Sequence, residues 1–178
     1  MISEPEIVNL VATADLGQPV DLIQVSMLPD IIFDQEIYGG RVAYFKSSDT
    51  FGKVSIFFSG KLISVGSRSE EQARHDLLLV RDFLVSHGII ESVELSPLTR
   101  NIVATLNLSV SIDLELMSTD VNVIYEPEQF PAVILRYNNP KGTFLIFHSG
   151  KIVISGVRSV KELYDSANYI TTIVDNFV

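Results

Sequence analysis

Hydrophobic residues along the chain recur with two different periods, which predict short strands and longer helices. Compact apolar runs bounded by polar residues, such as 9–13 and 101–106, are typical of strands. Behind Ser69 and Ser159 the apolar residues instead recur every three or four positions, as on the buried stripe of a helix. Each serine is followed three positions later by a glutamine or glutamate, which indicates a capping box. Two similar units are predicted, each reading strand, helix, several strands and a longer helix.

Some of the predicted strands are apolar on both faces. In the run 144–147, alternation directs Phe144 and Ile146 to one face and Leu145 and Phe147 to the other. The predicted helices are enough to cover only one face of an antiparallel sheet. An uncovered apolar face usually marks a binding surface, although a partner subunit or loops would also explain it.

The chain contains the same pattern twice. The segment Asn9–Thr13 recurs 92 positions later as Asn101–Thr105, and Ser59–Lys61 recurs 90 positions later as Ser149–Lys151. Such self-similarity indicates a duplicated structural unit. We therefore expect two repeats, residues 1–92 and residues 93–178.

The change of spacing from 92 to 90 predicts an insertion. The first repeat must carry two extra residues between its early strand and Ser59. The segment Lys46–Gly52 is polar and turn-like. We expect the extra residues in a hairpin there.

Composition limits the chemistry that the chain supports. Without cysteine it forms no disulfide and no thiolate metal site. Its three histidines, His75, His87 and His148, are scattered and have no evident chemical partner. The sequence also lacks the familiar hydrolase and phosphate-loop motifs. We expect no metal, no cofactor and no enzymatic activity.

Charge and hydropathy bear on location and partners. A net charge of -9 argues against nucleic acid binding unless basic residues gather on one face. No long uncharged apolar run and no basic, apolar leader are present. We expect an intracellular, cytoplasmic protein without a membrane span.

Two segments of the second repeat carry a resemblance to a known family. Residues 125–136 read YEPEQFPAVILR, and residues 144–156 read FLIFHSGKIVISG. Together with the paired Asn-aliphatic-Val-Ala-Thr strands, they resemble the core signature of TATA-box-binding proteins. The acidic composition and the lack of a long low-complexity stretch before the first repeat resemble the archaeal members.

The resemblance implies both a fold and a function. The implied fold is α+β, with two tandem repeats that form a saddle-shaped, curved antiparallel β-sheet and carry helices on its convex face. The implied function is that of a general initiation factor. It binds the minor groove of A·T-rich promoter DNA on the nucleoid, bends it, and recruits a B-type initiation factor and RNA polymerase.

The resemblance also implies the residues that contact DNA. Phe130 and Phe147 match the aromatic pair that wedges between base steps, a mode for which this family is itself the standard instance. Asn9 and Asn101 match asparagines whose amides donate to minor-groove acceptors. The remaining matched positions are aliphatic contacts, a hydroxyl donor in place of the usual threonine, and basic residues that meet phosphates: Val11, Ile63, Val103, Pro131, Leu145, Val153, Ser155, Lys61, Arg136 and Lys151.

The first repeat departs from the family pattern. At the spacing of 92, Tyr38 stands in place of the first wedge phenylalanine, whereas Phe57, at the spacing of 90, keeps the second. Ser55 stands at the position of Leu145, and Val65 at that of Ser155. A buried tyrosine hydroxyl needs a hydrogen-bond partner, so we expect a weaker wedge in this repeat. Arg41 adds either a phosphate contact or an exposed hairpin cation.

The expected partners follow from the same comparison. Glu126, Glu128 and Gln129 resemble the acidic loop edge that contacts the B-type factor, and a homodimer of the free protein is another partner that an open apolar face allows. The alternative function is a paralogue that acts mainly as a protein-binding regulator, with weak or altered DNA binding.

Overall fold

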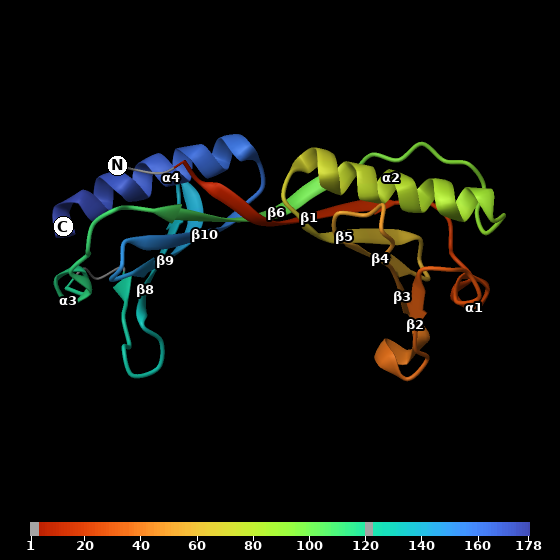
Figure 1. Ribbon diagram of the computed structural model, residues 1–178, viewed down its shortest axis with the longest axis horizontal. Coiled ribbons are helices and arrows are strands. Elements are labelled where there is room, and N and C mark those ends of the chain that lie inside the picture. Colours follow the sequence, from red (N-terminus) through yellow and green to blue (C-terminus); the bar gives the residue numbers. More distant parts are fainter. Residues whose placement is uncertain (1–3, 120–122) are drawn as a thin grey trace. The chain divides into compact units, whose positions relative to one another are not determined.

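The structure is a computed structural model that describes residues 4–119 and 123–178. The chain divides into two compact units (Figure 1). The first-repeat unit is Asn9–Arg100, and the second-repeat unit combines Asn101–Val178 with Met1–Val8. The division into repeats 1–92 and 93–178 stays a prediction.

The first-repeat unit contains an antiparallel sheet with strand order β2-β3-β4-β5-β1. Its elements in chain order are β1 (Glu6–Asp15), whose first three residues belong to the second-repeat unit, α1 (Leu22–Val25), β2 (Ile31–Phe33), the 3-10 helix η1 (Ile37–Gly40), β3 (Val42–Phe45), β4 (Lys53–Phe57), β5 (Lys61–Ser67) and α2 (Glu70–Ser86).

The second-repeat unit contains an antiparallel sheet with strand order β6-β10-β9-β8-β7. Its elements are β6 (Leu98–Asn107), whose first three residues belong to the first-repeat unit, α3 (Leu114–Met117), β7 (Val123–Ile124), β8 (Ala132–Asn138), β9 (Lys141–Phe147), β10 (Lys151–Val157), α4 (Val160–Val174) and the 3-10 helix η2 (Asp175–Phe177). The predicted sequence of strand, helix, several strands and a longer helix is therefore confirmed in both units.

A long helix covers one face of each sheet (Figure 1). Helix α2 packs on β4 and β5, and helix α4 packs on β9 and β10. Alternate strand residues point to this face and are fully buried. They include Val54, Ile56 and Leu62 in the first-repeat unit and Phe144, Ile146 and Ile152 in the second. Burying each such side chain contributes about 1.5–3 kcal/mol. These two layers form the core of each unit.

Both long helices begin with the predicted capping box. The Ser69 hydroxyl accepts from the Gln72 amide at 3.1 Å, and Ser159 accepts from Glu162 at the same distance. The Gln72 and Glu162 side chains return to accept from the amides of the residues before each serine, at 2.8 and 2.7 Å. These bonds satisfy amides that a helix start leaves free.

The extra residues of the first repeat lie elsewhere than the sequence predicted. Ile32 pairs with Tyr44, twelve positions on, whereas Ile124 pairs with Ile134, ten positions on. The next hairpins are equally long in both repeats, because Val42 pairs with Phe57 and Ala132 with Phe147. The insertion is therefore in the loop 34–41, and the prediction of an insertion in Lys46–Gly52 was wrong.

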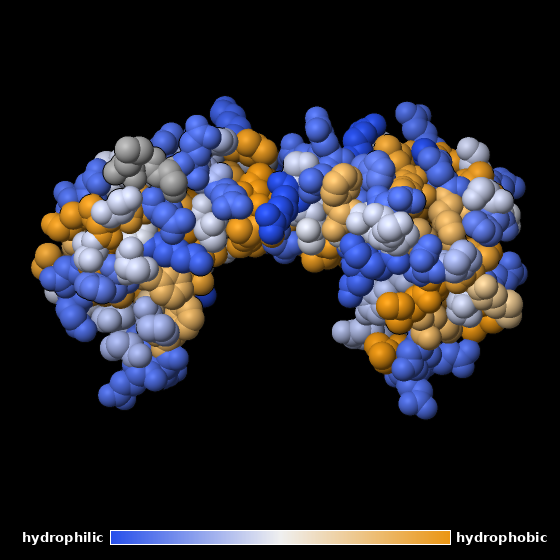
Figure 2. Space-filling model, in the orientation of Figure 1, coloured by the Kyte–Doolittle hydropathy of each residue, from blue (hydrophilic) through white to orange (hydrophobic). Residues whose placement is uncertain are grey.

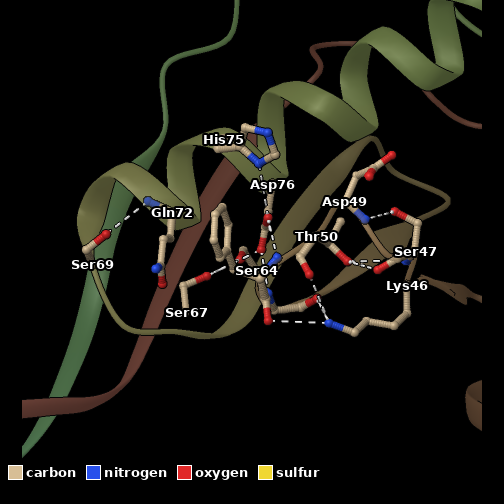
Figure 3. Close-up of polar contacts among 12 residues, drawn as sticks. Lys46, Ser47, Asp49, Thr50, Ser64, Ser67, Ser69, Gln72, His75 and Asp76 are labelled. Carbon is tan, nitrogen blue, oxygen red and sulfur yellow. Dashed lines mark hydrogen bonds and ion pairs between the residues drawn. The ribbon is translucent and has the colours of Figure 1, made fainter.

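The polar character of Lys46–Gly52 has a different cause. The Lys46 ammonium donates to the carbonyls of Thr50 and Gly52 at 3.2 and 2.9 Å, and the Thr50 hydroxyl donates to Ser47 O at 3.0 Å (Figure 3). The segment is polar because its side chains hold its own backbone in a turn.

Candidate nucleic-acid interface

The sheet face opposite the helix, which we call the open face, is lined by half-buried and exposed side chains in the first-repeat unit. Strand pairing brings Val11 opposite Val65, and Ile63 opposite both Thr13 and Ser55. The structure thus places these predicted contact residues on one surface: Asn9, Val11, Phe57, Ile63 and Val65, with Lys61 exposed at the start of β5.

The second-repeat unit has an equivalent open face. Val153 of β10 lies opposite Leu145 of β9 and Thr105 of β6. The predicted residues on this face are Asn101, Val103, Leu145, Phe147, Val153 and Ser155, all half-buried. Apolar side chains therefore stand on both faces of these strands, as alternation predicted, and the long helix covers only one.

Each predicted asparagine is held in one orientation by a glycine amide. Asn9 Oδ1 accepts from Gly66 N at 2.9 Å, and Asn101 Oδ1 accepts from Gly156 N at 2.9 Å. Because a backbone amide only donates, the bonded side-chain atom must be the oxygen. The NH2 group is left as a donor in both units.

The two glycines orient the predicted asparagines, and the sequence reasoning did not single them out. They have φ angles of 103° and 86°, a region that glycine occupies without steric cost. Each lies where the pairing of β5 with β1, or of β10 with β6, shifts register, and this irregularity directs an amide at the asparagine. Their recurrence as Gly66 and Gly156 at a spacing of 90 was the available signal.

The second-repeat unit assembles the predicted aromatic pair. The rings of Phe130 and Phe147 meet edge to face, with centroids 5.9 Å apart. Phe130 precedes β8 and remains 38% exposed, and the neighbouring Pro131 is exposed as well. Their unit therefore presents a compact aromatic group at the surface.

The first-repeat unit does not assemble an equivalent pair. Tyr38 lies in η1 with a φ of 52° and is 74% exposed. No ring contact joins it to Phe57 within residues 4–119 and 123–178. Phe130 lies four positions before Ile134, and Gly40 lies four positions before the corresponding Tyr44. The insertion in loop 34–41 thus shifts Tyr38 out of register with Phe130.

This longer loop also exposes apolar side chains. Ile37 and Tyr38 in the loop, and Ile32 in the preceding strand β2, are all exposed, and hydrophobic side chains reach the surface in this part of the first-repeat unit (Figure 2). The carboxylates of Asp34 and Glu36 lie in the same loop.

Basic side chains surround the open faces. Lys61 and Arg41 are exposed in the first-repeat unit, and Lys151 and Arg136 are exposed in the second. None of these four cations forms an ion pair in the described part of the chain. They are free to meet an anionic ligand although the net charge is -9.

The β4–β5 and β9–β10 turns depend on glycine. Gly60 and Gly150 have φ angles of 89° and 81°, a region that glycine occupies without steric cost. A Cβ on Gly60 would lie 2.0 Å from Gln18 O, and one on Gly150 would lie 2.2 Å from Leu108 O. These glycines let each turn pack closely and fix where Lys61 and Lys151 begin their strands.

The predicted partner residues lie in an exposed turn between β7 and β8. The amides of Gln129 and Phe130 both donate to Glu126 O at 2.9 Å. Glu126, Glu128 and Gln129 are exposed, and the two carboxylates form no ion pair with any residue that the structure describes. The turn thus presents two negative charges beside the Phe130 ring.

Asp76 is a buried carboxylate that the sequence reasoning missed. It lies on α2 and is fully buried, and its oxygens accept from Phe51 N at 3.0 Å and from Gly52 N at 2.7 Å (Figure 3). The helical pattern gave no signal, because its partners lie 24 and 25 positions away in the sequence. Its role is to fasten the β3–β4 hairpin to the helix.

Within the described residues, no group of three or more His, Asp or Glu side chains is placed to hold a metal ion. In the same residues, no helix has both the length and the hydropathy needed to cross a membrane.

Comparison with known proteins identifies the family. The family model for transcription factor TFIID (or TATA-binding protein) matches residues 4–84 and 96–177. The TATA-box-binding protein of Cenarchaeum symbiosum is 36% identical over 175 residues, which cover 98% of this chain and 96% of that protein. The one from Methanothermobacter thermautotrophicus is 36% identical over 161 residues, covering 88% and 87%.

A solved structure agrees with the sequence comparisons. The Methanococcus jannaschii TBP superposes with a TM-score of 0.88 and 30% identity, and the match covers 98% of this chain and 99% of that one. The predicted α+β fold class is thereby confirmed. The family consists of transcription factors rather than enzymes. This chain belongs to the TATA-box-binding protein family.

Proposed function

We propose that the protein binds the minor groove of A·T-rich promoter DNA, bends it, and recruits a B-type initiation factor and RNA polymerase. The observation that carries this proposal is the fixed orientation of Asn9 and Asn101, whose oxygens are occupied by glycine amides. Both side chains therefore offer donors, and the minor groove at A·T pairs offers only acceptors.

The rest of the open face supports the same ligand. Its half-buried aliphatic side chains, such as Val11 and Val103, provide no hydrogen-bond partner for the amino group of guanine, which favours A·T pairs. The Phe130–Phe147 pair is a suitable wedge for a base step. Free cations such as Lys61 and Lys151 supply phosphate contacts.

The partner part of the proposal rests on the exposed acidic turn. Glu126 and Glu128 would repel phosphate but would pair with basic groups of a protein. We place the B-type factor at this turn. The working location is then the cytoplasm, on the nucleoid.

A titration of the purified protein tests this function. Fluorescence anisotropy would compare a TATA-like duplex with a scrambled duplex of the same length, with and without the B-type factor. We expect preference for the TATA-like duplex, affinity that falls as salt rises, and tighter binding with the factor. Equal affinity for the two duplexes under all conditions would contradict the proposal.

The second candidate is a paralogue that acts mainly by binding proteins. It is favoured by the exposed Tyr38 and Ile37 in the lengthened loop and Ile32 in β2, and by the absence of a Tyr38–Phe57 ring contact in the described residues. This candidate predicts retained binding to the B-type factor but no bend in DNA.

Sedimentation of the free protein would show whether the open face also supports a homodimer.

A further inference from the structure

A pocket of about 440 Å³ lies at one edge of the first-repeat unit's open face. Phe57, Lys61 and Ile63 line it from the sheet, and Leu98 and Arg100 line it from the start of β6. All of these residues belong to the first-repeat unit. Arg100 is the one cation of the pocket to which the proposed function assigns no role.

Arg100 is held at this surface by a specific hydrogen bond. Its Nε donates to Thr13 Oγ1 at 2.8 Å, and Thr13 lies opposite Ile63 in the β1–β5 pair. Since Ile63 belongs to the open face, the bond draws the guanidinium toward that face. A side chain that would otherwise sample many rotamers is thereby fixed in position.

The outer part of the guanidinium is unengaged. Arg100 is exposed, and within residues 4–119 and 123–178 it forms no ion pair and no hydrogen bond besides the one to Thr13. The two terminal nitrogens are therefore available as a planar pair of donors, the arrangement that binds phosphate oxygens bidentately.

The charges around the pocket favour an anion. Lys61 is a second exposed cation in the lining. Asp15 also lines the pocket, but one of its oxygens accepts from Gly17 N at 2.9 Å, within its own turn. The titratable lining therefore carries two positive charges and one negative charge, in a protein whose net charge is -9.

We infer that Arg100, positioned by Thr13, binds a phosphate of the DNA backbone together with Lys61. This inference rests on the proposed function, and it adds a phosphate-binding residue to that site. Thr13 acts as the positioning residue.

The contact is specific to the first repeat. The residue 92 positions before Arg100 is Val8, which has neither charge nor hydrogen-bond donors in its side chain. The unit whose Tyr38 and Phe57 form no ring pair thus has an additional phosphate contact. Its hold on DNA is consequently more electrostatic than that of the second-repeat unit, and more sensitive to salt.

Salt-dependent DNA binding by the full-length protein tests this inference. The slope of log K against log salt would be measured by anisotropy for the unmodified protein and for the variants Arg100→Gln, Arg100→Lys and Thr13→Val. Arg74→Gln is the matched control, since Arg74 is an exposed arginine on α2 and its loss changes the net charge equally. Circular dichroism would establish that each variant is folded.

We expect Arg100→Gln to lower the magnitude of the slope by about 0.9, the loss of one phosphate contact. Its affinity should fall about tenfold at low salt. Arg100→Lys should retain most of the slope because the charge remains. Thr13→Val should weaken binding less than Arg100→Gln, with little change in slope, and Arg74→Gln should match the unmodified protein.

Two outcomes would overturn the inference, and they are distinguishable. If the unmodified protein binds TATA-like DNA but Arg100→Gln keeps its slope and affinity, Arg100 binds no phosphate and the proposed function stands. If the unmodified protein binds no DNA even at low salt with the B-type factor, the proposed function fails together with this inference. Should Arg100→Gln fail to fold, Thr13→Val still tests the arrangement, and binding without any loss in that variant would contradict the positioning by Thr13.

Discussion

The Phe130 ring meets the Phe147 ring edge to face, with centroids 5.9 Å apart and planes inclined at 69°. Such aromatic pairs stabilise one another beyond the area that they bury. In the first-repeat unit, by contrast, Tyr38 is displaced by the two extra residues of loop 34–41 and stands 74% exposed. The two units therefore differ in how well they form the aromatic pair that the proposed function assigns to the wedge.

The first prediction concerns how strongly the aromatic side chains of each unit bend the DNA. Replacing Phe130 and Phe147 with alanine should abolish most of the DNA bend, because opening a base step costs a few kcal/mol that apolar contact must offset. Replacing Tyr38 and Phe57 should cost less. Energy transfer between dyes at the two ends of a short duplex would report the bend, and a central dye would separate the two kinks.

Phe51→Ala provides the control for the wedge variants. Its ring is exposed and packs against His75 on α2, so its loss should leave the bend unchanged. Equal losses from the two double variants would show that Tyr38 wedges as well as phenylalanine does.

The second prediction concerns the asparagine donors. Asn101→Asp should keep the bond from Gly156 N, because a carboxylate also accepts, but it replaces the donor NH2 with a negative oxygen. Binding to TATA-like DNA should weaken by about 1–3 kcal/mol, while the midpoint of thermal unfolding stays nearly unchanged. Anisotropy and thermal unfolding measure the two quantities.

Asn168→Asp makes the same change of charge on the exposed surface of α4 and should hardly affect binding. If both variants bind equally well, the Asn101 amide donates nothing to the ligand.

The third prediction concerns the partner. Reversing the charge of Glu126 and Glu128 with lysine should impair the ternary complex with DNA and the B-type factor. Binary binding to DNA should persist or strengthen slightly, since the substitutions remove repulsion from phosphate. Gel-shift titrations with and without the factor would separate the two effects.

The matched control reverses Glu71 and Glu94, which are exposed in the first-repeat unit. An unchanged ternary affinity after the reversal of Glu126 and Glu128 would remove the partner assignment from this turn.

The fourth prediction concerns stability. Asp76→Ala should lower the free energy of unfolding by about 2–4 kcal/mol, because it leaves the Phe51 and Gly52 amides without their acceptor. Asp82→Ala should cost less than about 1 kcal/mol, since Asp82 is exposed and its ion pair with Arg81 lies at the surface. Urea unfolding followed by circular dichroism measures both changes.

In the second repeat, a neutral side chain on α4 bonds to the corresponding hairpin. Ser166, 90 positions after Asp76, donates its hydroxyl to Lys141 O at 2.9 Å. If Asp76→Ala unfolds at the same urea concentration as the unmodified protein, the buried carboxylate does not fasten the hairpin.

Much of the fold could be predicted from the sequence because its signals are local. The period of apolar residues distinguished strands from helices, and the serines at 69 and 159 marked the helix starts. The duplication and the two-faced strands around Phe144–Phe147 predicted a sheet with an open apolar face. Each of these features depends on residues a few positions apart, or on direct comparison of the two repeats.

Tertiary structure decided what depends on distant partners. The location of the insertion required the pairing of Ile32 with Tyr44, because residue spacing alone showed that two residues were extra but not in which loop. The orientation of Asn101 required the Gly156 amide, 55 positions away, and the burial of Asp76 required the hairpin at Gly52. A hydrogen bond between such positions forms only once the sheet and helix are packed, so sequence alone identifies the residue types and the folded chain determines their roles.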